Sequence, residues 1–208
     1  MVRPIRIALV GYGLAGKVFH APLIKATDGL ALVTVVSRDV GKVRADLPDS
    51  EVAGDIGEVL QDDSIQLVVI ATPDTLHADQ ALAALDAGKH VLLDKPFAPT
   101  LAEATKVAGR AAERGRILAI FHNRRWDADF LTIKRLIADE VLGEIVQFES
   151  HFDRLRPDVT DRWKDRRSAG VWQDLGPHLV DQALQLFGMP NAIMADLGVQ
   201  SVRRGDDH

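Results

Sequence analysis

Cysteine is absent from the sequence, so the protein can form no disulfide, no cysteine-ligated zinc or iron–sulfur site and no thiol nucleophile. This absence excludes a small secreted scaffold held by disulfides, and it fits a reducing, cytoplasmic setting. Long apolar runs are absent as well, because the roughly 18 consecutive apolar residues of a membrane span occur nowhere. The apolar stretch within residues 1–10 is too short for a signal peptide and is predicted to be a strand.

Positive charge is not in excess either, since 25 Lys and Arg stand against 30 Asp and Glu and the net charge is −5. This balance offers no basic surface to nucleic acid or to an anionic membrane, and neither is expected as a partner. No H-E-x-x-H and no G-x-S-x-G pattern occurs, so neither a metal site nor a serine nucleophile is predicted. The seven histidines are dispersed without ligand spacing, at His20, His77, His90, His122, His151, His178 and His208.

What is present is an ordinary globular composition, with 47% hydrophobic and 26% charged residues. It excludes intrinsic disorder or a fibrous repeat as a description of the whole chain. A length of 208 residues corresponds to one full domain and part of another, because domains most often hold ~100–150 residues.

Short apolar runs alternate with helical patterns through the first 121 residues. Nearly continuous apolar strands separated by helices predict an α/β domain, a doubly wound parallel sheet with helices on both faces. The predicted strands are Ile5–Val10, Leu30–Val36, Leu67–Ala71, His90–Leu93 and Ile117–Ile120. The predicted helices are Ala15–Ala26, Asp55–Gln61, Thr75–Ala87 and Leu101–Arg114.

The pattern changes after Phe121, and residues 122–208 are expected to begin a second, α+β domain. Helical spacing over Asp127–Glu140 and over His178–Phe187 predicts two helices, and alternation over Val146–Phe152 predicts a half-buried antiparallel strand. The charged segment Asp153–Arg167 has no period and is predicted to be a long loop. The remaining residues are too few to finish a sheet, so this domain looks incomplete and the chain is expected to be part of a longer protein.

A glycine-rich turn follows the first predicted strand and precedes the first predicted helix. It has the pattern G-x-G-x-x-G, in which Gly11 permits the sharp turn, Gly13 lets a pyrophosphate approach the backbone and Gly16 lets the helix pack closely. The strand, turn and helix around the motif favour dinucleotide binding over a plain connecting turn. The phosphates would lie at the helix N-terminus, beside Leu14 and Ala15.

Cofactor choice is read at the end of the second strand, where an acidic residue binds the ribose of NAD. Here Ser37 and Arg38 occupy that place. A serine hydroxyl and a guanidinium suit the 2′-phosphate of NADP, which is therefore the expected cofactor. The nearby Asp39 keeps NAD open, because a shift of one residue would bring its carboxylate to the ribose.

Four separated motifs occur in order along the chain, namely the glycine turn, Ala71–His77, Leu92–Phe97 and Asp174–His178. Together they resemble the Gfo/Idh/MocA family of NAD(P)-dependent sugar and polyol oxidoreductases, and the resemblance spans essentially the whole chain. Phe121–Asp127 narrows it toward the branch that includes NADP-dependent scyllo-inositol dehydrogenases. In that family an open sheet and a C-terminal helix complete the second domain, and the sheet is the usual surface for forming homo-oligomers.

The resemblance implies that Lys95 is catalytic. The family motif is usually Glu-Lys-Pro, whereas this chain has Asp94-Lys95-Pro96, which shortens the carboxylate by one methylene and keeps its charge. An ammonium at the end of a parallel strand can bind a substrate hydroxyl and stabilise developing alkoxide charge. Without the resemblance, a surface lysine at a strand end would be an equal alternative.

Asp174 and His178 complete the catalytic set that the resemblance implies. They are four residues apart, so both can face one cleft if Gly176-Pro177 opens a helix. His178 can accept the hydroxyl proton and Asp174 can bind the substrate or orient the imidazole. The alternative is an Asp that caps the helix and a His with a structural role.

Other site residues also follow from the resemblance. Thr72, Pro73, His77, Lys95 and Pro96 are expected on the cofactor side. Arg124 and His151 are expected to contact the substrate together with the catalytic set. Trp126 is expected in the core, and Trp163 either over the nicotinamide or against a neighbouring subunit.

The expected function is NADP-dependent hydride transfer between the nicotinamide and a secondary hydroxyl of a cyclic polyol or sugar, in the cytoplasm. Three alternatives remain. The first is a non-catalytic NADP-binding regulator on the same fold. The second is another enzyme with transient hydride chemistry, such as a redox-assisted glycosidase or a reductase of imines or pyrroles. The third is a fragment that binds the nucleotide without turnover.

Overall fold

The computed structural model describes residues 3–153, 170–196 and 198. By its internal contacts the chain divides into two compact units, Met1–Phe121 and His122–His208. Trp163 and nearly all of the loop predicted over Asp153–Arg167 lie outside the described residues.

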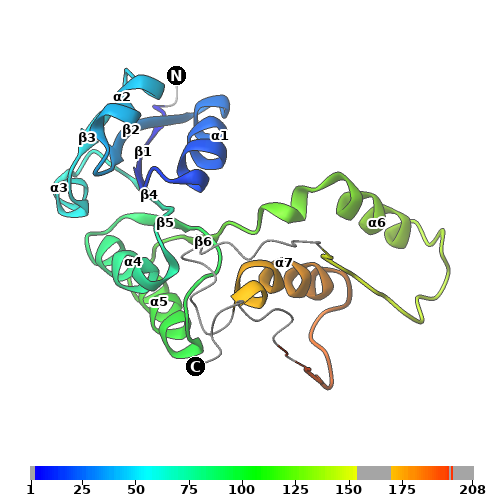
Figure 1. Ribbon diagram of the computed structural model, residues 1–208. Coiled ribbons are helices and arrows are strands. Elements are labelled where there is room, and N and C mark those ends of the chain that lie inside the picture. The colour runs from blue at the N-terminus through cyan, green and yellow to red at the C-terminus, as the bar shows by residue number, and fades with distance from the viewer. Residues whose placement is uncertain (1–2, 154–169, 197, 199–208) are drawn as a thin grey trace, which may run out of the picture. The chain divides into compact units, whose positions relative to one another are not determined.

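The first unit is built on a six-stranded parallel sheet with the order β3-β2-β1-β4-β5-β6 (Figure 1). This is the doubly wound order, in which the chain starts at the centre of the sheet and builds outward in both directions. Its strands are β1 (Ile5–Val10), β2 (Leu30–Val36), β3 (Glu51–Ala53), β4 (Leu67–Ile70), β5 (His90–Leu93) and β6 (Leu118–Ile120).

Helices cover both faces of this sheet because successive strand residues point to opposite sides. In β1, Ile7 and Leu9 pack with the helices that follow β1 and β2, whereas Ala8 and Val10 pack with the three later helices. The helical elements are η1 (Gly16–His20, a π-helix), α1 (Ala21–Ala26), α2 (Val40–Asp46), α3 (Ile56–Gln61), η2 (Asp74–Leu76, a 3-10 helix), α4 (His77–Asp86) and α5 (Leu101–Glu113).

Capping boxes fix where two of these helices begin. Asp55 caps α3 and Thr100 caps α5, and in each case a glutamate three residues later binds back to the backbone N–H of the capping residue. These reciprocal bonds satisfy donors that the first helical turn leaves free.

The predicted strands agree closely with the sheet, and the bounds of β1, β2 and β5 are those predicted. Two elements were not predicted, the three-residue β3 and the helix α2. Both are too short to show a period, and α2 buries only Val43. They form because β3 pairs with the end of β2 and because Asp39 caps α2.

The second unit contains η3 (Asn123–Trp126, a 3-10 helix), α6 (Ala128–Ala138) and α7 (Gly170–Phe187). The strand predicted over Val146–Phe152 is wrong, since these residues are described and form no ladder. A strand needs a neighbour to accept and donate its backbone hydrogen bonds, and alternation of residue types cannot supply one. Val146 is accordingly 90% exposed.

Helix α7 begins earlier than predicted. Gly176-Pro177 does not open it, because Gly170 does and Pro177 lies inside the helix. Asp174 is therefore an interior residue and not the cap of this helix.

Trp126 was expected in the core and is instead 76% exposed. Within the described residues, no helix combines the length and apolar character that crossing a bilayer requires.

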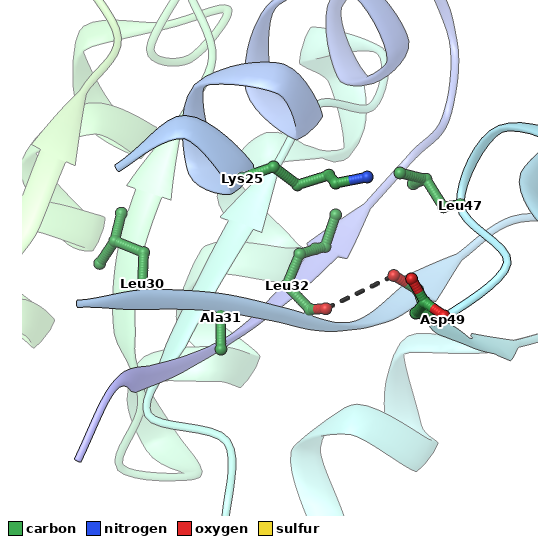
Figure 2. Close-up of a pocket in the computed structure, with 7 residues that line it drawn as sticks. Lys25, Leu30, Ala31, Leu32, Leu47 and Asp49 are labelled. Atoms are coloured by element: carbon green, nitrogen blue, oxygen red, sulfur yellow. Dashed lines mark hydrogen bonds between the residues drawn. The ribbon is translucent and has the colours of Figure 1, made fainter. Parts of the chain in front are cut away.

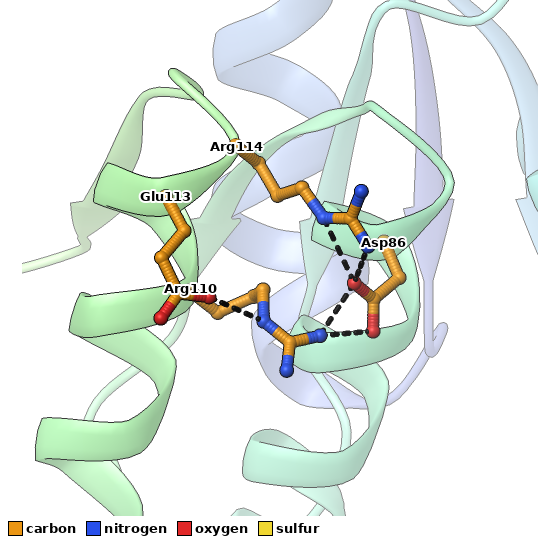
Figure 3. Close-up of polar contacts among 4 residues, drawn as sticks. All are labelled: Asp86, Arg110, Glu113 and Arg114. Carbon is orange, nitrogen blue, oxygen red and sulfur yellow. Dashed lines mark hydrogen bonds and ion pairs between the residues drawn. The ribbon is translucent and has the colours of Figure 1, made fainter.

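An ion-pair cluster joins α4 to α5 at the surface of the first unit (Figure 3). Asp86, the last residue of α4, accepts hydrogen bonds from Arg110 at 2.5 Å and from Arg114 at 2.8 Å, both on α5. These hydrogen bonds and the two positive charges hold the pKa of the Asp86 carboxyl below its ordinary value. Glu113 contacts only the Arg110 side of the cluster, at 3.1 Å.

We expect Asp86→Asn to lower the melting temperature near neutral pH. Because the pKa of Asp86 is lowered on folding, its contribution is present above the ordinary carboxyl pKa of about 3.9 and is lost as the pH falls through the lower folded value. Salt should shrink the difference from wild type, since the side chains are partly exposed. Thermal melts against pH and salt test this, with Glu113→Gln as the weaker control; a difference independent of both would contradict it.

Candidate functional site

The candidate site lies at the carboxyl edge of the parallel sheet. The last residues of four strands are in register there, because Val10 of β1 pairs with Val36 of β2 and Ile70 of β4, and Ile70 pairs with Leu93 of β5. The segments that follow these strands therefore emerge at one edge. They are the glycine turn, Ser37-Arg38, the Thr72-Pro73 turn and Asp94–Pro96. Between β1 and β4 the strand order reverses, and in doubly wound sheets this point is where ligands bind.

The glycine turn has the geometry that its sequence predicts. Gly11 has a φ of +97°, which favours glycine, and its N–H donates to the carbonyl of Val36 at 3.0 Å. A Cβ on Gly11 would lie 2.8 Å from the carbonyl oxygen of Ala71, and one on Gly16 would lie 2.2 Å from that of Gly11. Neither position has room for a side chain, so the helix start is pressed against the turn.

Gly13 has the opposite surroundings. It is exposed, and a Cβ built on it meets nothing within 4 Å. The backbone of the turn is thus open to an incoming group at the position where the motif brings a pyrophosphate. Leu14 is also exposed and Ala15 is half-buried, directly before the first turn of η1. This open backbone beside two crowded glycines fits a dinucleotide.

Arg38 and Asp39 at the end of β2 differ in their contacts. Asp39 caps α2, and its Oδ1 accepts the N–H of Lys42 at 3.0 Å. Its carboxylate is therefore bound to the protein's own backbone. Arg38 is exposed, and the hydroxyl of Ser37 accepts the N–H of Asp39 at 3.2 Å.

Lys42 is a cation near the turn that the sequence did not single out. Its Nζ donates to the carbonyl of Tyr12 at 3.1 Å and lies 5.7 Å from the centre of the Tyr12 ring. Tyr12 in turn lies near Asp46, which pairs with Lys17 at 2.6 Å. Burial and the neighbouring Asp46 raise the pKa of the Tyr12 phenol. Lys42 is five residues beyond Ser37, and only the fold of α2 brings its ammonium back to the turn.

His77 is placed inside the protein. It is 1% exposed, its Nδ1 lies 2.9 Å from the carbonyl oxygen of Pro96 and its Nε2 lies 3.0 Å from that of Thr72. Carbonyl oxygens only accept, so both contacts are hydrogen bonds only when both ring nitrogens carry a proton. The ring thus links the two cofactor-side turns, and its nitrogens are engaged by the protein itself. Pro73 is exposed, and the hydroxyl of Thr72 donates to Gln80 at 2.6 Å.

Lys95 follows β5 and is half-buried. Its backbone N–H donates to the Asp94 carboxylate at 2.8 Å, and the other carboxylate oxygen lies 3.9 Å from Nε2 of His20. Burial raises the pKa of the Asp94 carboxyl, but the His20 ring and the N–H and charge of Lys95 outweigh this effect and hold it below its ordinary value. Asp94 is therefore an ionised neighbour of the candidate catalytic lysine.

Asp174 and His178 lie in the second unit, one turn apart on α7. His178 is buried and Asp174 is half-buried. Asp181 and Gln182 continue the same face of the helix and bind η3. Asp181 forms a paired contact with the guanidinium of Arg125 at 2.5 and 2.7 Å, which raises the pKa of that arginine. This face of α7 is consequently polar and half-buried in place of an ordinary apolar stripe.

Arg124 and His151 are the two remaining substrate candidates. Arg124 pairs with Asp127 at 2.8 Å and lies over the ring of Phe152, while its carbonyl accepts Gln182 Nε2 at 3.0 Å. His151 is exposed, in a segment without strand structure. Glu149 and Asp153 lie 3.7 and 3.9 Å from its ring nitrogens. The structure thus holds Arg124 firmly in the second unit and leaves His151 at the surface.

A separate hollow of about 220 Å³ opens at the other end of the sheet. It surrounds the start of β2, where the Ser50 hydroxyl donates to the carbonyl of Leu32 at 3.4 Å (Figure 2). The amino ends of parallel strands are not where doubly wound sheets bind ligands, so this hollow is not the candidate site. Its lining residues are Lys25, Leu30, Ala31, Leu32, Leu47, Asp49 and Ser50.

Among the described residues, no group of three or more His, Asp or Glu could hold a metal ion.

Comparison with known proteins agrees with this geometry. Residues 5–122 match the NAD-binding Rossmann fold of the GFO_IDH_MocA oxidoreductase family, and residues 130–208 match the GFO/IDH/MocA C-terminal domain. The chain belongs to the Gfo/Idh/MocA family. As a Gfo/Idh/MocA protein, it carries the dinucleotide-binding fold that the glycine turn predicted.

Individual relatives span most of the chain. The uncharacterized oxidoreductase YdgJ of Escherichia coli is 51% identical over 93% of this chain, and the scyllo-inositol 2-dehydrogenase (NADP(+)) IolW of Bacillus subtilis is 40% identical over 96%. The solved structure of YPO2259 from Yersinia pestis has a TM-score of 0.88 at 51% identity, and covers 97% of this chain and 59% of that one. This chain spans 56% of the length of each of the two curated relatives.

Alanine substitutions at Gly16 and at Gly13 should affect different properties of the glycine turn, the first its stability and the second its affinity for a dinucleotide. Gly16→Ala places a methyl group 2.2 Å from the Gly11 oxygen, and we expect it to lower the free energy of unfolding by at least about 1–3 kcal/mol. Gly13→Ala has room, so its stability should be unchanged or raised by about 0.4–1 kcal/mol. The added methyl group should nevertheless weaken dinucleotide binding by tenfold or more, about 1.4 kcal/mol. Urea unfolding and fluorescence titration measure the two effects; unchanged affinity in Gly13→Ala would contradict this assignment.

Proposed function

We propose that the protein is an NADP-dependent dehydrogenase that acts on a secondary hydroxyl of a cyclic polyol or sugar, or reduces the ketone in reverse. The observation that carries the proposal is the shared edge of the sheet. The open glycine turn and Lys95 follow strands whose ends stand level, so a nucleotide bound at the turn lies at the edge that bears the lysine.

NADP is the proposed cofactor because of the charges beside the turn. Asp39 is occupied as a helix cap, which leaves Ser37 and Arg38 at the end of β2. Lys42 adds a second cation near the turn. Two cations beside a carboxylate that caps a helix favour the 2′-phosphate of NADP over the ribose hydroxyls of NAD. The similarity to IolW, an NADP(+) enzyme by its name, supports the same choice.

The bound nicotinamide would supply the hydride donor or acceptor, which no protein side chain can provide. In the proposed reaction, Nζ of Lys95 binds the substrate oxygen and stabilises its developing negative charge. His178 accepts the hydroxyl proton in the oxidative direction and returns it in reduction. Asp174, one turn before His178 on α7, orients the imidazole or the substrate.

The substrate class rests on the family and on the chemistry of the proposed residues. In the proposed reaction Lys95 and His178 act on the same oxygen, which suits a secondary alcohol, and we propose Arg124 and Asp174 for the further hydroxyls of the ring. The name of IolW, scyllo-inositol 2-dehydrogenase, supports the inositols as the first compounds to test. We propose a cytoplasmic enzyme, since a chain without cysteine has no disulfide that requires an oxidising compartment.

Fluorescence titration with NADPH and NADH in parallel tests the cofactor proposal. Loss of one charge-assisted contact to a phosphate costs about 1.5–3 kcal/mol. Arg38→Ala should therefore weaken NADPH binding by about 10-fold or more and leave NADH binding unchanged, and Lys42→Ala should act in the same direction. Lys106→Ala, an exposed lysine on α5, is the matched control. Equal affinity of the wild type for both nucleotides would overturn the choice of NADP.

Turnover tests the catalytic proposal, with scyllo- and myo-inositol as substrates and the absorbance of NADPH as the signal. His178→Gln should lower kcat by about 10²–10⁴-fold, because the proton acceptor is lost. Lys95→Met should lower kcat by about 10²–10³-fold, because the oxygen loses its cationic partner. NADPH affinity should stay within about threefold in the His178 variant. If wild-type turnover is found and neither variant reduces it, these residues are not catalytic.

A further inference from the structure

Two buried histidines lie next to the residues on either side of Lys95. His20 is 2% exposed and His77 is 1% exposed, and they come from η1 and α4. His20 faces the side chain of Asp94, which precedes Lys95, and His77 contacts the carbonyl of Pro96, which follows it. Lys95 therefore lies between one residue whose carbonyl oxygen is within hydrogen-bond distance of His77 and one whose carboxylate lies 3.9 Å from the ring of His20.

The His77 side of this arrangement rests on the chemistry of proline. Pro96 has no N–H, so its carbonyl oxygen is the only backbone group by which it can be held. Nδ1 of His77 lies 2.9 Å from that oxygen, while Nε2 lies 3.0 Å from the carbonyl oxygen of Thr72 after β4. One ring thus fixes the distance between the turn that follows β4 and the residue that follows Lys95.

The His20 side acts through a carboxylate. Asp94 accepts the backbone N–H of Lys95 with one oxygen at 2.8 Å and faces Nε2 of His20 with the other at 3.9 Å. The His20 ring is held by Phe121, with ring centres 4.4 Å apart. Because η1 begins at Gly16, His20 also connects the glycine turn to the segment that presents the lysine.

A packing role alone does not account for these contacts. Leu or Phe would fill a buried site without the cost of burying an imidazole. Both histidines instead direct ring nitrogens at the neighbours of one residue, Lys95, from positions 75 and 18 residues earlier in the chain. Each ring lies next to a residue that adjoins Lys95.

We propose that His20 and His77 are positioning residues that together fix the backbone of Lys95 and so aim its ammonium at the substrate oxygen. The proposal rests on the catalytic role proposed for Lys95. His77 acts through its ring nitrogens, which lie within hydrogen-bond distance of the carbonyl oxygens of Pro96 and Thr72. The two histidines do not touch the substrate.

The ammonium of Lys95 can be observed directly. Reductive ¹³C-methylation of the chain gives each lysine its own NMR signal, and Lys95→Arg assigns the one in question. His77→Leu removes both donors, whereas His77→Gln keeps an N–H donor that can reach a carbonyl. His20→Phe keeps a ring in contact with Phe121 and removes the ring nitrogens. His90→Leu is the matched control, because His90 makes its contact, with the N–H of Ile117, at the opposite end of β5.

We expect the Lys95 signal to shift toward the position of exposed lysines in His77→Leu and in His20→Phe, and to stay close to wild type in His77→Gln and His90→Leu. In turnover, His77→Leu and His20→Phe should lower kcat by about 10- to 100-fold, the cost of misplacing a reacting group, with NADPH affinity within about threefold.

The proposal is overturned if folded His77→Leu and His20→Phe leave the Lys95 signal unchanged, or if His77→Gln shifts it as far as His77→Leu does. Should His77→Leu not fold, His77→Gln and His20→Phe decide by the same criterion. The lysine signal requires neither cofactor nor substrate, so a shifted signal in a protein without turnover would reject the proposed function and keep the positioning role.

Discussion

The close approach of Gly16 to Gly11 is the constraint on which the rest of the site depends. A Cβ on Gly16 would lie 2.2 Å from the carbonyl oxygen of Gly11, so the helix can start where it does only without a side chain there. This contact leaves the backbone at Gly13 open and sends η1 along the sheet edge. At the end of η1, His20 reaches the Asp94 carboxylate. The helix that begins at the glycine turn thus ends beside the segment that carries the candidate lysine.

The level ends of the parallel strands supply the second condition. Val10, Val36, Ile70 and Leu93 stand in register, and every residue that follows them emerges at one edge. Apolar side chains on both faces of the sheet hold the strands in this register, because a slip would move them out of two cores at once. The buried core maintains the fold without these polar groups, so the groups at the edge are available to bind a ligand.

Two residues at this edge have a different use from the one that their sequence position indicates. Asp39 stands where a carboxylate could bind a ribose, yet it caps α2. His77 follows the Thr72-Pro73 turn, yet its ring is buried between two carbonyl oxygens. In both cases a backbone group within the protein takes the side chain that sequence position alone would assign to a ligand. The first contact is part of the argument for the proposed NADP, and the second is part of the argument for the proposed positioning role of His77.

The sequence by itself determined the doubly wound domain, three strand bounds and the glycine turn, because apolar runs and glycine requirements are local. It did not determine β3, the absence of a strand at Val146–Phe152 or the start of α7 before Pro177, because each depends on a partner elsewhere in the chain. The contacts of Lys42, His20 and Asp94 were decided by the tertiary structure alone. Their contacts join residues distant in sequence, and no local pattern records which side chains a parallel sheet brings to one edge.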